Sequence, residues 1–188
     1  ACLAVFWVGW EFFRSATIGL WGALLFAAHP MHTESVAWIA GVTDVGCGLF
    51  YFVSIGAYLR YRYGGPSGLL WQGISLLSFL AALLYKEMAL TLPLVIVFLD
   101  YATEAPESGV RLATRLRRFY PFLVTLAIYI VLRVNALGAF ARTVVPLQIG
   151  IVDRLLTMLY FVAQYLTDLI LPVRHNAFHV FEPFFRLR

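Results

Sequence analysis

Apolar residues run through this chain in long stretches that are broken only by short polar or turn-forming segments. The stretches cover residues 1–13, 15–31, 36–59, 67–85, 88–100, 119–133 and 152–171. The segment from Gly68 to Tyr85 carries no formal charge, which is typical of a membrane-spanning helix and differs from the strict alternation of a barrel strand. The pattern predicts an all-α fold, a single polytopic transmembrane bundle over residues 1–188 with about six or seven apolar helices.

The stretch from Ser67 to Leu99 allows two interpretations, one long helix or a hairpin broken at Lys86 and Glu87. The positive-inside rule separates them, because the Arg-rich segments share the cytoplasmic side only if two crossings lie between each segment and the next. The hairpin is therefore preferred. The segments contain Arg14, then Arg60 and Arg62, then Arg111, Arg115, Arg117 and Arg118.

The same count of membrane crossings places two polar interruptions together on the opposite, external or lumenal, side. These are the segment His29 to Glu34 and the pair Lys86-Glu87, and the connection from 133 to 153 with Arg142 falls on that side too. The path of the helix over 155–171 stays open, because it either crosses again or lies against the bundle as a partly amphipathic element. The side of residues 172–188 is also left open.

Composition supports a membrane protein. Hydrophobic residues make up 62% of the 188 positions and charged residues 13%, with a mean hydropathy of +0.83, whereas a soluble domain carries about 25% charged residues. The net charge of +4 does not indicate nucleic acid, because the basic residues lie in short inter-helix segments without interleaved aromatics. With only Cys2 and Cys47 present, neither a disulfide framework nor a thiolate metal site is supported.

The segment His29-Pro30-Met31-His32-Thr33-Glu34 brings two imidazoles and a carboxylate to the end of an apolar helix. Pro30 is expected to end that helix, and Thr33 to cap the next one with Glu34 in its first turn. One interpretation is a well-capped helix-turn-helix with interfacial histidines. The other is a site in which His29, His32 and Glu34 bind a phosphate or a divalent metal ion, or orient a catalytic group.

Further charged residues lie near this segment. Asp44 follows Glu34 by ten residues, about 15 Å further along if the helix is continuous, and is expected to pair with Lys86 or Arg133. Lys86-Glu87 is either a solvated pair or part of a polar cavity in which the lysine neutralises a lipid phosphate. Arg133 and Arg142 have the fork geometry for phosphate oxygens, although an arginine at a helix end often only anchors the interface.

Three strings carry a resemblance to a known family. They read AAHPMHTESVAWIAGVTDVGCGLFYFVSIGAYLRYR, AALLYKEMALTLPLVIVFLDY and RLLTMLYFVAQYLTDLILP. The chain resembles the membrane region of the transmembrane-and-tetratricopeptide-repeat O-mannosyltransferases and their bacterial relatives. The positions that match the motifs of that family are His29, His32, Glu34, Asp44, Lys86 and Glu87.

The resemblance implies a GT-C-type glycosyltransferase. It would transfer a sugar, mannose being the expected one, from a polyprenyl-phosphate carrier to a protein hydroxyl on the external face. The general base of such enzymes is a carboxylate in a first external loop, which would precede Ala1, and tetratricopeptide repeats would follow the membrane region. The chain is therefore expected to be a fragment of a longer protein, located in a bacterial inner membrane or the endoplasmic reticulum membrane with its site facing the periplasm or lumen.

The roles that follow are hypotheses. Lys86 and Arg133 would stabilise the departing phosphate, since negative charge develops there in the transition state. Glu34 or Glu87 would hold sugar or acceptor hydroxyls, and His32 would act as a hydrogen-bonding or metal partner. The alternatives are a polytopic transporter or lipid flippase, for which Asp44 is the best indication, and a non-catalytic membrane anchor.

Overall fold

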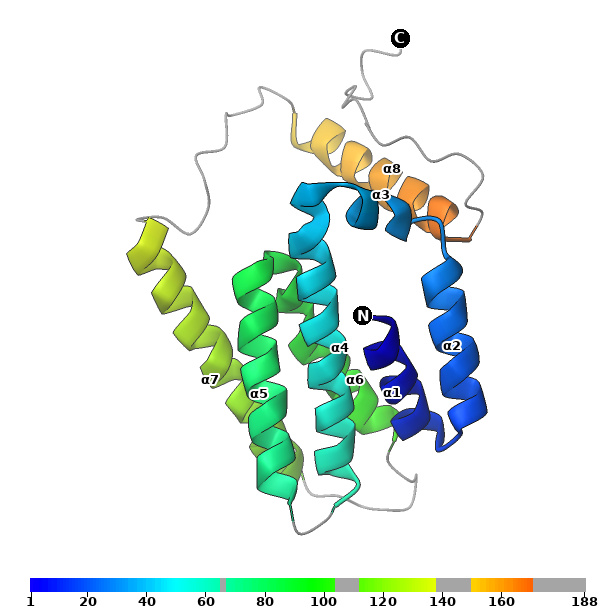
Figure 1. Cartoon of the computed structure of the whole chain (residues 1–188). Helices are drawn as coiled ribbons and strands as arrows, with labels where there is room; N and C mark the ends of the chain where they lie inside the picture. The colour runs from blue at the N-terminus through cyan, green and yellow to red at the C-terminus, as the bar shows by residue number, and fades with distance from the viewer. Residues whose placement is uncertain (65–66, 104–111, 138–149, 171–188) are drawn as a thin grey trace.

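The computed structural model describes residues 1–64, 67–103, 112–137 and 150–170 of the chain. All regular structure in this part is helical, as the sequence predicts (Figure 1). The helices are α1 (Cys2–Phe13), α2 (Ala16–Ala28), α3 (His32–Ala37), η1 (Ile39–Gly41), α4 (Val42–Arg62), α5 (Gly68–Tyr85), η2 (Glu87–Thr91), α6 (Leu92–Ala102), α7 (Leu112–Leu137) and α8 (Ile151–Ile170), where η marks a 3-10 helix.

The centre of the bundle is the antiparallel pair α4 and α5, with α7 packed against it (Figure 1). Tyr58 on α4, Phe79 on α5 and Phe122 on α7 are almost completely buried. The Phe122 ring lies 5.9 Å from the Tyr58 ring and 5.8 Å from the Phe79 ring, measured between centroids. Such edge-on and tilted aromatic contacts join the three helices with more than simple area burial.

The helices α1 and α2 form a hairpin beside α4. A Cβ atom on Gly19 would lie 2.7 Å from the carbonyl oxygen of Phe6, so only glycine allows the two backbones to approach this closely. On the α4 side, a Cβ atom on Gly56 would lie 2.7 Å from the Trp7 ring. Small residues at these two contacts bring α1 close to both neighbours, as is common in membrane helix packing.

The helical conformation is interrupted at Lys86, and the preferred hairpin is confirmed. Lys86 has extended backbone angles, φ −159° and ψ 142°, which end α5. After η2, helix α6 runs back toward the opposite end of the bundle (Figure 1). Pro93 stands in the first turn of α6, where a missing N–H costs no helical hydrogen bond.

The apolar stretch 36–59 is not one continuous helix. Trp38 has extended backbone angles, φ −100° and ψ 126°, and separates α3 from η1 and α4. The path of about 15 Å from Glu34 to Asp44, which was expected only for a continuous helix, therefore does not apply. The apolar pattern does not reveal this break, because both sides of it are equally apolar.

Three helical segments are long and apolar enough to cross a membrane: Ile39–Arg62, Gly68–Tyr85 and Ala113–Ala136. Cys2–Phe13 and Ala16–Ala28 are shorter apolar helices. About six or seven apolar helices were expected, and three of the helical segments in the described residues are long enough to cross. The short 88–100 stretch and the 152–171 stretch form α6 and α8, which are not among the candidate spans.

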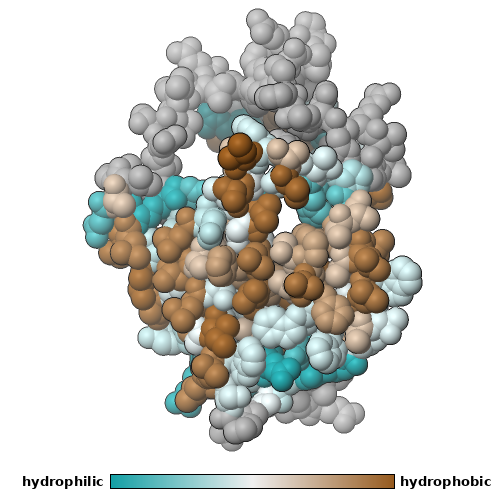
Figure 2. Space-filling view, viewed as in Figure 1, coloured by the Kyte–Doolittle hydropathy of each residue, from teal (hydrophilic) through white to brown (hydrophobic). Residues whose placement is uncertain are grey.

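Apolar side chains cover the outside of the bundle. Leu70, Leu77 and Leu84, spaced by seven residues along α5, are 62%, 70% and 64% exposed. Figure 2 shows the apolar residues of the visible face in a broad band over the sides, with hydrophilic residues toward the two ends. A surface of this kind is stable against hydrocarbon and unstable against water, which indicates an integral membrane protein.

The two ends of the bundle differ in chemistry. The Arg-rich end contains Arg14, Arg60, Arg62 and Arg118, which pair with two carboxylates, and Arg115, which lies over the Tyr101 ring. The opposite end, here called the histidine end, contains His29, His32, Asp44, Lys86, Glu87 and Arg133. The three Arg-rich segments therefore share one end, as the count of membrane crossings predicts. Helix α8 lies across the histidine end near α3 (Figure 1).

Candidate functional site

The turn between α2 and α3 forms as its sequence requires, with one correction. Helix α2 ends at Ala28, and His29 adopts extended angles just before Pro30, because proline disfavours a helical conformation in the residue before it. Helix α3 begins at His32, so Thr33 lies inside the helix and the prediction of Thr33 as its N-cap is wrong. Backbone hydrogen bonds from His32 to His29 at 3.2 Å and from Thr33 to Pro30 at 3.0 Å close the turn.

Both ring nitrogens of His29 have partners. Nδ1 accepts a hydrogen bond from the Met31 backbone N–H at 3.3 Å, and Nε2 donates to the Leu169 carbonyl oxygen of α8 at 3.0 Å. One acceptor and one donor correspond to the neutral tautomer with its proton on Nε2. His29 thus fastens the end of α2 to the end of α8, and a metal ion would have to displace one of these bonds.

His32 lies on an aromatic surface. Its ring centroid is 4.1 Å from that of Phe26 and 6.1 Å from that of His29. Burial lowers the pKa of His32 below its usual value because it disfavours the charged form, and His29 lowers it further because two protonated imidazoles would repel each other. His32 is therefore neutral at pH 7 and offers an uncharged imidazole for hydrogen bonding or metal coordination.

Among the described side chains, no group of three or more histidine, cysteine or carboxylate residues is placed to hold a metal ion. The side chain of Glu34 lies outside the described part, although its backbone belongs to the first turn of α3 as expected. The proposed metal set of His29, His32 and Glu34 therefore stays a prediction. Arg142, expected to contact phosphate, lies outside the described residues as well.

Asp44 and Lys86 form an ion pair between the first turn of α4 and the break after α5. The pairing of Asp44 with Lys86 was one of two predicted alternatives and is confirmed. Each side chain remains about two-fifths exposed, 40% for Asp44 and 39% for Lys86. The pair is thus anchored by two helices yet open to an incoming ligand.

Glu87, which follows Lys86 in the chain, makes a second ion pair. Glu87 accepts a hydrogen bond from Arg133 of α7, whose guanidinium also donates to the Tyr129 hydroxyl at 2.7 Å. A hydrogen bond from its own backbone N–H, together with that from Arg133, lowers the pKa of Glu87. Because Lys86 and Glu87 are consecutive, the two ion pairs bring residues of α4, η2 and α7 to one location.

A cavity of about 230 Å³ opens beside this location. Its lining consists of Ser35, Trp38, Ala40, Gly41 and Asp44. The walls come from the irregular segment between α3 and α4, and a Cβ atom on Gly41 would lie 2.5 Å from the Ser35 carbonyl oxygen. Glycine is therefore required for the tight turn that shapes the cavity.

The sequence did not point to Ser35 or Trp38 as site residues. Trp38 lies in an apolar run, where an aromatic side chain is read as part of the membrane belt. Its 60% exposure beside a polar cavity was not visible from periodicity. The one available signal was Gly41, whose position three residues after Trp38 indicates a local turn.

The described contacts place the predicted residues in two groups. Asp44, Lys86, Glu87 and Arg133 form the pair of neighbouring ion pairs. His29 and His32 form a second group at the α2–α3 turn and are joined to α8. Both groups lie at the histidine end of the bundle.

The Arg-rich end holds two buried carboxylates that sequence reasoning missed. The Glu11 carboxylate accepts hydrogen bonds from Arg60 at 2.6 Å, from Arg14 at 3.3 Å and from the Trp7 indole at 3.3 Å. It is 3% exposed, although its helix is otherwise apolar. A carboxylate is tolerated there because two cations and a neutral donor satisfy its oxygens.

Asp100 repeats this arrangement on the other side of α4. Its carboxylate accepts hydrogen bonds from the Tyr58 hydroxyl and from Arg62, both at 2.8 Å, and from Arg118 at 3.2 Å. The two arginines on α4 are Arg60 and Arg62, which point to Glu11 and Asp100 respectively. Helix α4 is therefore held between α1 on one side and α6 and α7 on the other.

Comparison with known proteins identifies relatives for part of the chain. It is 42% identical over 82 residues to Protein O-mannosyl-transferase tmtc2 of Xenopus laevis, and 37% identical over 95 residues to Protein O-mannosyl-transferase Tmtc2 of Drosophila melanogaster. It is 38% identical over 77 residues to human Protein O-mannosyl-transferase TMTC4. The aligned segments cover 42%, 46% and 38% of this chain.

These segments correspond to only 10% of each relative, so the chain spans about a tenth of the length of the curated relatives that it matches. No family model matches the chain. No solved structure matches it either.

Proposed function

Because part of the chain is homologous to protein O-mannosyl-transferases, we propose that it forms part of a GT-C-type membrane glycosyltransferase. The reaction transfers a sugar, mannose by the names of its relatives, from a polyprenyl-phosphate carrier to a protein hydroxyl. The site faces the periplasm or the lumen of the endoplasmic reticulum. One observation carries the proposal: the cations Lys86 and Arg133 lie together at the histidine end, each beside a carboxylate.

The two cations suit the leaving group. When the bond between sugar and phosphate breaks, negative charge grows on the phosphate oxygens, and nearby cations stabilise the transition state more than the bound donor. Arg133 is held in place by Tyr129 and can present its fork to two oxygens, whereas Lys86 acts as a point charge. Asp44 and Glu87 hold these cations in position before the donor binds.

The cavity beside Asp44 is the proposed sugar site. Its volume of about 230 Å³ and its mixture of carboxylate, hydroxyl and indole groups suit a hexose, which has both hydroxyl edges and an apolar face. Trp38 supplies the aromatic surface and Asp44 accepts hydrogen bonds from sugar hydroxyls. Glu34 or Glu87 holds the acceptor or further hydroxyls, with neutral His32 as a hydrogen-bonding or metal partner.

A second candidate function, transport, has less support. A transport path would place ionisable groups near the middle of the membrane, and Asp44 was the residue that favoured it. Asp44 lies in the first turn of α4 and pairs with Lys86 at the same end as Glu87 and Arg133. This clustering at one end favours group transfer at a membrane surface.

The test is transfer of radiolabelled mannose from a polyprenyl-phosphate donor by the protein at its full natural length, in membranes. Lys86→Ala and Glu34→Gln should each reduce the rate by about two orders of magnitude, comparable to removal of one charge-stabilising group. Lys86→Arg should retain a measurable rate, because it keeps the charge. Arg117→Ala at the opposite end is the matched control and should transfer at the wild-type rate.

Equal transfer by the wild type and Lys86→Ala at equal expression would refute the assignment of Lys86. A well-expressed wild type that transfers none of several sugars would refute the transferase function itself and favour transport or anchoring.

A further inference from the structure

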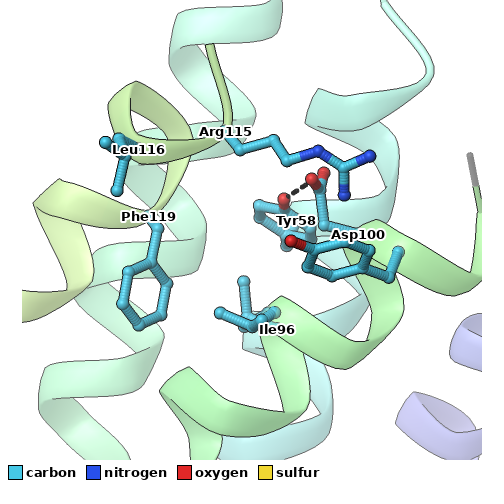
Figure 3. Close-up of a pocket in the computed structure, with 8 residues that line it drawn as sticks. Tyr58, Ile96, Asp100, Arg115, Leu116 and Phe119 are labelled. Carbon is cyan, nitrogen blue, oxygen red and sulfur yellow. Dashed lines mark hydrogen bonds between the residues drawn. The ribbon is translucent and has the colours of Figure 1, made fainter. Parts of the chain in front are cut away.

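A second cavity lies at the Arg-rich end, far along the bundle from the candidate sugar site. It has a volume of about 110 Å³ and lies between α4, α6 and α7 (Figure 3). Most of its wall is hydrocarbon, from Ile96, Val97, Leu116 and Phe119. A dry apolar cavity of about 150 Å³ holds a benzene molecule, so this cavity has room for a short segment of hydrocarbon chain.

The rim of the cavity is cationic. Arg115 extends over the opening with its guanidinium 4.0 Å from the centre of the Tyr101 ring (Figure 3). The other charged wall group, Asp100, already accepts hydrogen bonds from Tyr58, Arg62 and Arg118. Since two arginines neutralise that carboxylate, it does not repel an anion approaching Arg115.

The cavity lies where a bilayer would reach it. Helix α7 contributes Leu116 and Phe119 to the wall, and its candidate membrane span begins at Ala113. Leu116 of the wall is 56% exposed, as expected for a side chain that faces lipid. The hydrocarbon wall therefore lies at the edge of the membrane, with the arginines at headgroup level.

We propose that this cavity binds an anionic glycerophospholipid of the leaflet at the Arg-rich end. The lipid phosphate contacts Arg115, and a segment of one acyl chain enters the slot between α6 and α7. The shared chemistry, a phosphate on a hydrocarbon chain, also describes a polyprenyl phosphate. The phospholipid is favoured because the slot is small and an acyl chain lacks the methyl branches of an isoprenoid chain. Binding here does not depend on glycosyl transfer.

The experiment is native mass spectrometry of the full chain released from nanodiscs. Three compositions are compared: phosphatidylcholine alone, phosphatidylcholine with phosphatidylglycerol, and phosphatidylcholine with undecaprenyl phosphate. We expect one retained phosphatidylglycerol per chain in the second and no comparable retention of either other lipid. Retention of undecaprenyl phosphate in place of phosphatidylglycerol would overturn the phospholipid assignment.

Four variants locate the site. Arg115→Gln should weaken phosphatidylglycerol retention about tenfold, the size expected for one charge-assisted contact, and Arg115→Lys should restore part of it. Arg117→Gln makes the same charge change on an exposed neighbour outside the cavity and should retain the lipid. Val97→Phe fills the slot without altering any charge and should also abolish retention.

Circular dichroism and thermal melting of each variant show whether the fold is kept. Wild-type retention by both Arg115→Gln and Val97→Phe would overturn the proposal. Equal losses in Arg115→Gln and Arg117→Gln would also overturn it, since they would indicate general attraction to a basic surface.

Discussion

Ser54 of α4 and Ser75 of α5 exchange hydrogen bonds across the helix pair at the centre of the bundle. Each hydroxyl lies 2.8 Å from the backbone carbonyl oxygen of the other serine, and the two hydroxyl oxygens are 3.1 Å apart. Both residues are completely buried. On α4 the pair lies between Asp44, which lines the proposed sugar site, and Tyr58, which lines the proposed lipid cavity.

We expect Ser54→Ala and Ser75→Ala to destabilise the bundle only slightly, by about 0.6 kcal/mol each, the average for interhelical hydrogen bonds in membranes. Ser54→Leu should cost several times more, because it forces the two backbones apart. Reversible unfolding in detergent micelles measures both. A Ser54→Leu variant as stable as Ser54→Ala would contradict the close approach of α4 and α5.

The two buried carboxylates of the Arg-rich end should differ in importance. The side chains of Arg62 and Arg118 around Asp100 are 16% and 18% exposed, whereas those of Arg14 and Arg60 around Glu11 are 54% and 49% exposed. Removing a carboxylate leaves its arginines uncompensated, and this costs more where water cannot reach them.

We therefore expect Asp100→Asn to lower the free energy of unfolding by about 2–3 kcal/mol and Glu11→Gln by about 1 kcal/mol. Thermal unfolding at low and high salt gives the comparison, and only the Glu11 effect should shrink in high salt. A larger loss for Glu11→Gln than for Asp100→Asn would show that burial does not control the strength of these pairs.

The sequence predicted those features that depend on local apolarity. Hydropathy locates most of the helices but does not reveal the break at Trp38. The break at Lys86 and Glu87 is preferred because the positive-inside rule requires two crossings between the Arg-rich segments. The common end of the Arg-rich segments follows from the number of crossings between them. Each of these inferences needs only the order of residues along the chain.

Features that depend on distant contacts were missed. Glu11 and its partner Arg60 are 49 positions apart, and Asp100 lies 38 positions from Arg62. A single carboxylate in an apolar helix has many possible partners, and the sequence does not choose among them. The pairing of Asp44 was limited to two cations because few cations were assigned to that end, and this is why one of the alternatives proved correct.

His32 should titrate below the usual pH range of a histidine. Its lowered pKa means that the folded protein takes up the proton less readily than the unfolded chain. The stability that it contributes is therefore fully present above the unfolded pKa of about 6.5 and is lost as the pH falls toward the folded pKa. The titration of isotope-labelled histidines by NMR, assigned with His32→Gln, measures this shift.

Replacing His29 separates the two causes of that shift. His29→Gln removes the neighbouring imidazole and should bring the pKa of His32 part of the way back up, leaving the larger contribution from burial. A return to the full unperturbed value would show that the neighbouring charge dominates. No change would show that burial against Phe26 accounts for the whole effect.

Trp38 provides the sharpest test of the proposed sugar site, because its proposed role follows from the cavity and not from the sequence. An indole that supports the apolar face of a hexose contributes to donor binding and little to the departure of the phosphate. Trp38→Ala in the full-length protein should therefore raise the KM for the mannose donor about tenfold while kcat changes by less than about threefold. Trp38→Phe should be intermediate.

Trp21→Ala is the matched control for this measurement. Trp21 is 62% exposed on the outer face of α2, close to the 60% of Trp38, but it does not line the cavity. Its replacement removes the same side chain from the lipid-facing surface and should leave both kinetic constants unchanged. If Trp38→Ala lowered kcat at constant KM, the indole would act on the reacting groups or the fold, and the cavity would not be the site that binds the sugar.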